Sequence, residues 1–209
     1  MDTSSGHSIS IPFQDVTAII LAGGQGRRMG GIDKGLQLFQ GKPMVVHVLE
    51  RLEKQAGTIL ISANRNIDRY QVYGYPVFSD SIAGYPGPLA GFLTGLQHCQ
   101  TPYLATVPCD TPFIHEHLIE RLRTALITAE ADIAVAMTDD EGISKIQSVF
   151  TVMKSHLGNS LATYLGNGYH KLDRWFAMQK TITVPFAEKD AFININTLAE
   201  LAIYQPEFS

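Results

Sequence analysis

The chain has 209 residues, of which 45% are hydrophobic and 17% are charged, and its net charge at pH 7 is −4. This length and composition are ordinary for a globular protein with one large domain or two small ones. Proteins that bind nucleic acids without sequence preference are usually basic, so the negative net charge argues against that class.

The termini and the cysteines narrow the class further. The two cysteines, Cys99 and Cys109, are too few for a disulfide framework or a structural zinc site. Residues 1–14 have neither the basic start nor the long apolar run of a signal peptide, and we expect a flexible N-terminal tail. No segment contains the roughly 18 apolar residues that a membrane span requires. These features favour a cytoplasmic protein that binds no membrane, with a single domain over residues 15–209.

Strand-like and helix-like segments alternate along the chain. Residues 16–21 form a continuous apolar run that predicts a strand buried on both faces. Further strands are predicted, in chain order, at residues 58–62, 76–79, 103–107, 132–137, 146–152 and 191–195. Helices are predicted at residues 43–55, 88–98, 114–129, 157–165 and 171–178, and from Thr197 onward. The alternation predicts an α/β fold: a single-domain, Rossmann-like, mostly parallel sheet with helices on both faces.

A glycine-rich segment, LAGGQGRRMGGIDK, follows the first predicted strand and covers residues 21–34. Glycine lets a backbone approach a ligand closely, and arginine and lysine attract phosphate. Lys34 is not followed by Ser or Thr, as a P-loop requires, and the glycine spacing does not fit the dinucleotide fingerprint. The segment therefore predicts another kind of nucleotide-phosphate site. Its pattern resembles the signature loop of the nucleotidyltransferases, and this resemblance implies that Arg28 and Lys34 are the catalytic cations that neutralise the phosphates.

Polar residues also follow other predicted strands. Asp110 lies between two prolines after the strand at 103–107, and a carboxylate beside bound phosphates is a typical Mg²⁺ ligand. We predict that Asp110 binds the metal, the alternative being an N-cap of the next helix. Asp80 is expected to contact a ribose, a base or the metal, or else to form a turn. The Asn64 amide both donates and accepts, which suits a base edge. Cys109 is predicted to be a small buried thiol.

Six short blocks of the sequence together match the motif pattern of one protein family. They are LAGGQGRRMGGIDKGL (21–36), GKP (41–43), SANR (62–65), DSIAGYPGPLAG (80–91), VPCDTPFI (107–114) and FININT (192–197). In this combination the chain resembles the molybdenum cofactor guanylyltransferases of the nucleotidyltransferase superfamily. The resemblance implies a fold of the nucleotide-diphospho-sugar transferase type. It also implies transfer of GMP from GTP to the molybdopterin cofactor, with release of pyrophosphate.

The resemblance also implies which residues take part. By matching position, GTP would be bound by Leu21, Ala22, Gly23, Lys34, Asn64, Asp80 and Asp110, with Mg²⁺ at Asp110. Asn194 and Asn196 would lie on the molybdopterin side. The segment 138–147 departs from the family pattern, so contacts to the second substrate there are not implied.

Chemistry in this class needs no general base, because a phosphate monoester is mostly ionised at neutral pH. The chain offers no convincing base, and its cations would screen the repulsion between two polyanions. Two other readings stay open: a cytidylyltransferase on the same fold, and a non-catalytic module that binds GTP. GTP and the molybdopterin cofactor are the expected partners, together with transient contacts to other cofactor-biosynthesis proteins.

Overall fold

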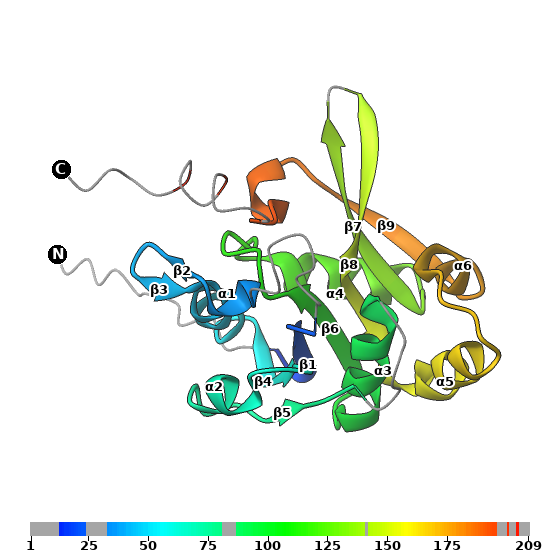
Figure 1. Cartoon of the computed structure of the whole chain (residues 1–209). Helices are drawn as coiled ribbons and strands as arrows, with labels where there is room; N and C mark the ends of the chain where they lie inside the picture. The colour runs from blue at the N-terminus through cyan, green and yellow to red at the C-terminus, as the bar shows by residue number, and fades with distance from the viewer. Residues whose placement is uncertain are drawn as a thin grey trace, which may run out of the picture.

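A seven-stranded sheet forms the centre of the part of the chain that the structure describes (Figure 1). The computed structural model describes residues 13–23, 33–80, 87–140 and 142–195, together with Glu200 and Tyr204. The strands lie in the order β5-β4-β1-β6-β8-β7-β9. In chain order their bounds are β1 (Phe13–Leu21), β4 (Ala56–Ser62), β5 (Val77–Phe78), β6 (Tyr103–Pro108), β7 (Ile133–Asp140), β8 (Ile143–Lys154) and β9 (Thr181–Phe186).

The strand order contains a reversal at β1. From β1 the chain goes to β4 and β5 on one side, and it then crosses back to β6 on the other side. The strands pair in parallel except at β8, which is antiparallel to both β6 and β7. The predicted mostly parallel sheet is therefore confirmed. The carboxyl end of β1 is the topological switch point, where open α/β sheets bind their ligands.

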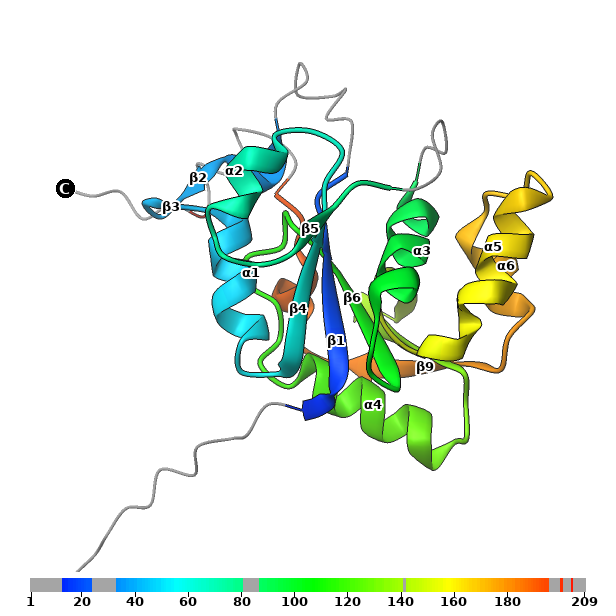
Figure 2. The same ribbon diagram turned by 90° about the horizontal axis from the view of Figure 1, so that it is seen from below.

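Helices cover both faces of the sheet, as the sequence predicts. The helices α1 (Met44–Leu52) and α4 (Leu118–Thr128) pack on one face. The helices α3 (Pro88–His98), α5 (Gly158–Gly166) and α6 (Leu172–Ala177) pack on the other (Figure 2). Within β1, Ala18 and Ile20 face the first core and Ile19 faces the second. Successive side chains of a strand point to opposite faces, so this apolar run serves both cores.

Shorter elements complete the described part of the chain. They are the 3-10 turns η2 (Lys34–Leu36), η3 (Ser155–Leu157) and η4 (Lys189–Phe192), the helix α2 (Ile67–Gln71), and the hairpin strands β2 (Leu38–Phe39) and β3 (Lys42–Pro43). Neither α2 nor the hairpin was predicted from the sequence. The hairpin turns at Gln40 and Gly41, whose φ values of 47° and 80° suit a tight hairpin connection.

The strand predicted at residues 191–195 is wrong. This segment begins inside η4 and continues without joining a strand pair, while the outermost strand beside β7 is β9. The sequence of β9 contains Pro185, which an edge strand tolerates because one side of it has no partner strand. Ala191 and Phe192 give the segment a strand-like apolar pattern, yet they are buried against the core without joining the sheet.

Smaller predictions differ at their boundaries. The helix expected at 114–129 begins only at Leu118, and β1 begins at Phe13, inside the predicted tail. The helix expected from Thr197 lies largely outside the described residues. Cys99 and Cys109 are both free thiols, and Cys109 is buried as predicted. Among the described helices, none combines the length and apolar composition needed to cross a membrane.

The fit of α3 against the sheet gives a stability prediction. A Cβ atom at Gly95 would lie 2.9 Å from side-chain carbons of both Ile19 and Leu104. Gly95→Ala should lower the free energy of unfolding by about 1–3 kcal/mol, because the packed core has no room for a methyl group. Gly166→Ala is the control, since nothing lies within 4 Å of a Cβ there. It should be neutral or stabilising by up to about 1 kcal/mol. Urea denaturation measures both, and equal effects would contradict the packing argument.

Candidate active site

The parallel strands β5, β4, β1 and β6 bring their carboxyl ends to one edge of the sheet. Most of the candidate residues lie just after these strand ends. β1 ends at Leu21 and β4 ends at Ser62. Backbone hydrogen bonds continue past these ends, because Ala22 N donates to Ser62 O (2.8 Å) and Cys109 N donates to Leu21 O (3.2 Å). In Figure 2 this edge lies at the top, between α2 and the first turn of α3. The loops after the four strands are therefore fixed relative to one another.

Lys34 and Asp110 form an ion pair at this edge. Lys34 Nζ donates to Asp110 Oδ2 over 3.1 Å, and the two side chains are only 25% and 13% exposed. Asp110 does not cap a helix, because α4 begins at Leu118 with His117 in the N-cap position. The N-cap reading of Asp110 is therefore wrong. A cation and a carboxylate lie side by side, which suits a phosphate group that arrives with its own cation.

Asp80 lies near the end of β1 and is held by several side chains. Its Oδ1 accepts hydrogen bonds from Ser62 Oγ (2.7 Å) and Thr94 Oγ1 (3.3 Å). Its Oδ2 accepts from Asn64 Nδ2 (2.7 Å), and Asn64 Oδ1 accepts from the Asp80 backbone N–H (2.9 Å). The Asp80 carboxylate thus has a fixed orientation beyond what a turn requires. The Asn64 amide, expected at a base edge, is engaged with Asp80 in this structure.

Gly23 lets the backbone after β1 pass close to this pair. A Cβ atom at Gly23 would lie 2.9 Å from Asn64 Nδ2 and 3.3 Å from Asp80 Oδ2. Any larger residue would push the pair away, so the close approach itself requires glycine here. Leu21 packs in the same way on Gly91 of α3, where a Cβ would meet its side chain at 2.6 Å.

The chain returns to the same edge after η4. Thr111 Oγ1 donates to Asn194 Oδ1 over 2.6 Å, and Ile195 N donates to the Asp110 carbonyl over 2.9 Å. Asn194, expected on the side of the second substrate, is therefore tied to the loop that carries Asp110. The other two predicted residues, Arg28 and Asn196, lie outside the described residues, as does the glycine-rich segment 24–32.

Three residues at this edge were not assigned a role from the sequence: Asp33, Asn66 and Tyr70. Tyr70 Oη donates to Asp33 Oδ1 (2.6 Å), and Asn66 Nδ2 donates to Asp33 Oδ2 (2.9 Å). Burial raises the pKa of the Tyr70 phenol far above its ordinary value, so it stays a donor at neutral pH. Tyr70 lies in the five-residue helix α2 and Asn66 is the N-cap residue before it, so no periodic pattern in the sequence marked these two residues.

The donor set at this edge fits a magnesium ion that arrives with a nucleotide. Mg²⁺ takes one or two carboxylates and completes its shell with water and phosphate oxygens. Asp110 offers one carboxylate at the strand end. Across the residues that the structure describes, no group of three His, Cys, Asp or Glu side chains forms a ready-made metal site. Most oxygen ligands would therefore come from the nucleotide and water.

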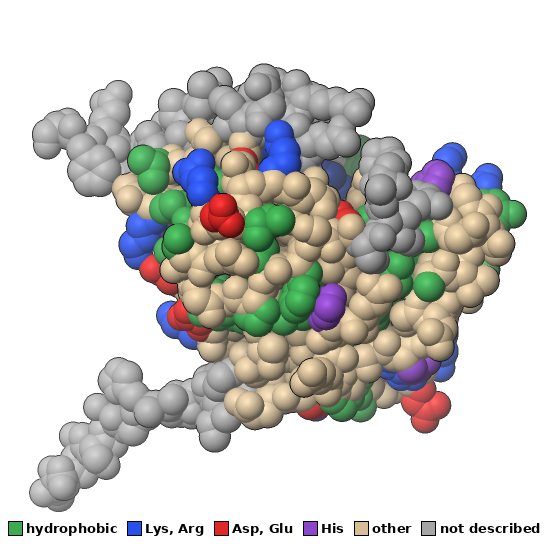
Figure 3. Space-filling view, turned by 60° about the horizontal axis from the view of Figure 1, so that its bottom comes forward, with side chains coloured by type: hydrophobic (Ala, Val, Ile, Leu, Met, Phe, Trp, Pro, Cys, Tyr) green, Lys and Arg blue, Asp and Glu red, His purple; other side chains and the backbone are tan. Residues whose placement is uncertain are grey.

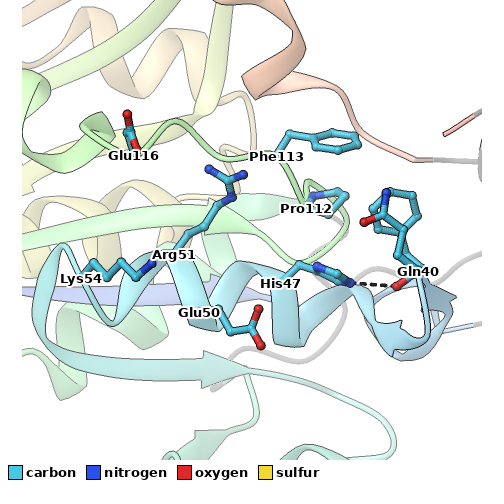
Figure 4. Close-up of a pocket in the computed structure, with 9 residues that line it drawn as sticks. Gln40, His47, Glu50, Arg51, Lys54, Pro112, Phe113 and Glu116 are labelled. Carbon is cyan, nitrogen blue, oxygen red and sulfur yellow. Dashed lines mark hydrogen bonds between the residues drawn. The ribbon is translucent and has the colours of Figure 1, made fainter. Parts of the chain in front are cut away.

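A surface cleft of about 400 Å³ lies apart from the candidate residues, between α1 and the loop after β6 (Figure 4). Its lining is Phe39, Gln40, His47, Glu50, Arg51, Lys54, Pro112, Phe113 and Glu116. Its charges have both signs, and Arg51 already donates to the carbonyl oxygen of Ile114 (2.9 Å). On the face in Figure 3, the described basic and acidic side chains are likewise interspersed. The mixed charges of this cleft therefore do not indicate an anion-binding site.

Comparisons with known proteins agree on the class. Residues 18–182 match the family model described as "MobA-like NTP transferase domain". A solved structure from Archaeoglobus fulgidus, titled molybdopterin-guanine dinucleotide biosynthesis protein A, superposes with a TM-score of 0.69 at 19% identity, over 90% of this chain and 96% of that one. A 4-diphosphocytidyl-2C-methyl-D-erythritol synthase from Anaerococcus prevotii superposes with a TM-score of 0.70 at 16% identity, over 91% and 94% of the two chains. The fold is that of the nucleotidyltransferases.

Similar sequences narrow the assignment. A protein of Ralstonia nicotianae named molybdenum cofactor guanylyltransferase is 50% identical over 196 residues, which cover 91% of this chain and 96% of that protein. A Bordetella petrii protein of the same name is 50% identical over 187 residues, covering 90% and 95%. The chain belongs to the MobA-like NTP transferase family.

The Lys34–Asp110 pair can be tested through stability. Lys34→Ala should lower the free energy of unfolding by about 1–2 kcal/mol, because the mostly buried Asp110 carboxylate loses its charged donor. The matched control is Lys42→Ala, which breaks a pair with Glu50 whose side chains are about half exposed (52% and 48%). Its effect should be clearly smaller, because solvent screens an exposed pair. Urea denaturation at pH 7 compares them, and equal losses would show that burial gives the Lys34 pair no added strength.

Proposed function

We propose that this protein transfers GMP from GTP to the terminal phosphate of molybdopterin, which releases pyrophosphate and forms molybdopterin guanine dinucleotide. The observation that carries the proposal is the Lys34–Asp110 pair at the carboxyl edge of β1 and β6, opposite the fixed Asp80 carboxylate. The shared name of relatives that are half identical over nearly the whole chain supports the same reaction.

The reaction is a substitution at the α-phosphorus of GTP. An ionised oxygen of the molybdopterin phosphate forms the new P–O bond, and the bond between the α-phosphorus and its bridging oxygen breaks. The electron pair leaves with pyrophosphate, so no proton has to be removed from the nucleophile. The chain must then hold two polyanions together and stabilise the charge that grows on the leaving group.

Lys34 and Asp110 divide this task. Mg²⁺, held by Asp110 with phosphate oxygens and water, would neutralise charge on the triphosphate when bound. The Lys34 amine, which lies 3.1 Å from the Asp110 carboxylate, would donate to a phosphate oxygen in exchange for that carboxylate. Arg28 is proposed as a second cation.

The other predicted site residues are divided between the two substrates. We assign GTP to the backbone of Leu21, Ala22 and Gly23 and to Asn64 and Asp80, and molybdopterin to the side of Asn194 and Asn196. Asn64 would act by holding Asp80, given the hydrogen bonds in both directions between them. A cytoplasmic location and transient contacts with other cofactor-biosynthesis proteins stay predictions.

The decisive experiment measures pyrophosphate release from Mg-GTP with and without the molybdopterin substrate, and again with CTP in place of GTP. Release that requires both GTP and molybdopterin supports the proposal. Faster turnover with CTP would favour the cytidylyltransferase. Tight GTP binding without any pyrophosphate release would leave only the non-catalytic module.

The metal role of Asp110 gives a second prediction. Asp110→Asn should lower the Mg²⁺-dependent turnover rate at least about 100-fold, because a neutral amide oxygen is a poor ligand for this hard cation. Asp132→Asn is the matched control, since Asp132 pairs with Lys154 at 3.0 Å outside the proposed site. Steady-state rates across a Mg²⁺ titration are compared with melting temperatures. Full activity in the Asp110 variant would falsify the metal assignment.

A further inference from the structure

The residue before Lys34 has an unusual set of partners. Asp33 stands in the N-cap position of η2, but its side chain makes no capping hydrogen bond. Both of its carboxylate oxygens accept from α2 and its N-cap residue instead, one from Tyr70 Oη and the other from Asn66 Nδ2. A carboxylate that accepts from two donors is held firmly, since hydrogen bonds to a charged group are about twice as strong as neutral ones.

The 3-10 turn η2 also packs closely against its neighbours. A Cβ atom at Gly35 would lie 2.6 Å from Tyr70 Oη and 3.1 Å from both Cβ and Sγ of Cys109. Tyr70 is fully buried, so its hydroxyl cannot swing aside into solvent. The turn has little internal support of its own, since η2 is only three residues long. Its position therefore depends on contacts from outside, with Tyr70 on one side and the loop of Asp110 on the other.

We infer that Tyr70 and Asn66 are positioning residues that fix Lys34 at the reacting phosphates by holding Asp33. The inference rests on the proposed role of Lys34. Neither residue is among those assigned to GTP or molybdopterin. Without their two donors, the Asp33 carboxylate would be free to attract the neighbouring Lys34 amine and draw it away from Asp110 and the triphosphate.

The consequence is a kinetic signature. Lys34 is proposed to act on charge that grows as pyrophosphate leaves, so its misplacement should slow turnover more than it weakens GTP binding. Tyr70→Phe removes one hydroxyl from the buried ring and keeps its volume. It should lower kcat about tenfold and change KM for GTP by less than about threefold. Asn66→Gly removes the second donor and suits the backbone, because φ at Asn66 is +51°. It should show the same split.

A double-mutant cycle separates positioning from a merely structural role. If Tyr70 acts through Lys34, Tyr70→Phe should cause no further loss of kcat in a Lys34→Ala background. Equal fold losses in both backgrounds, or an unchanged kcat in the single variant, would overturn the inference. Two control variants should keep wild-type kcat. Tyr75→Phe breaks a tyrosine–carboxylate bond with Glu53, and Tyr164→Phe removes a buried hydroxyl that donates to the Lys171 carbonyl.

A readout without turnover keeps this test separate from the proposed function. Reductive methylation of the Lys34 amine, followed by mass spectrometry of its peptide, should differ several-fold in rate between Tyr70→Phe and wild type, because the amine exchanges Asp110 for Asp33. Tyr164→Phe should methylate at the wild-type rate. An unchanged methylation rate would contradict the positioning role even in an active enzyme. A wild-type protein that releases no pyrophosphate would contradict the proposed function, while the methylation rates still decide whether Tyr70 holds Lys34.

Discussion

The parallel pairing of β1 with β4 on one side and β6 on the other is the constraint on which the candidate site depends. At the end of β1, Leu21 lies opposite Ser62 in β4 and Pro108 in β6. The register is fixed by the buried faces of the strands, because a slip of one residue would turn every side chain to the wrong core. The loops with Asn64 and Asp110 thus leave the sheet level with Gly23. The hydrophobic core sets the distances at which the polar residues meet.

Those polar residues are satisfied by one another before any ligand binds. Lys34 pairs with Asp110, Asn64 with Asp80, and Thr111 with Asn194. Throughout the described chain, no buried side-chain nitrogen or oxygen lacks a hydrogen-bond partner. A ligand must therefore exchange contacts, and a nucleotide alone would offer Lys34 a partner while leaving the carboxylate without one. In the proposed reaction, a nucleotide that arrived with its cation would offer a partner to each, and this would couple the binding of the two.

The sequence predicted the parts of this arrangement that depend on local pattern. Apolar runs located most of the strands, and the apolar spacing at 88–98 gave α3 its observed bounds. Predictions from the sequence failed where contacts between distant residues determine the structure. The apolar segment 191–195 has the composition of a strand, but β9 holds the place beside β7. The partners of Asp33 are 33 and 37 positions away, and the short helix α2, with Asn66 at its N-cap, has too few residues for a periodic signal. Similarly, nothing in the spacing showed that the Asn64 amide would hold Asp80.

The C-terminal half explains why the sheet is not wholly parallel. Because β8 runs antiparallel, the β7–β8 hairpin turns at the carboxyl edge and extends beyond the sheet (Figure 1). The parallel strand β9 then returns the chain to that edge, where Lys189 of η4 pairs with Asp140 of the hairpin at 2.7 Å. Asn194 follows and bonds to Thr111, next to Asp110. The first half thus supplies the candidate nucleotide residues, and the second half brings separate segments to the same carboxylate. Two sets of contacts that meet at Asp110 are what the proposed transfer requires, because donor and acceptor phosphates must be held independently before they react.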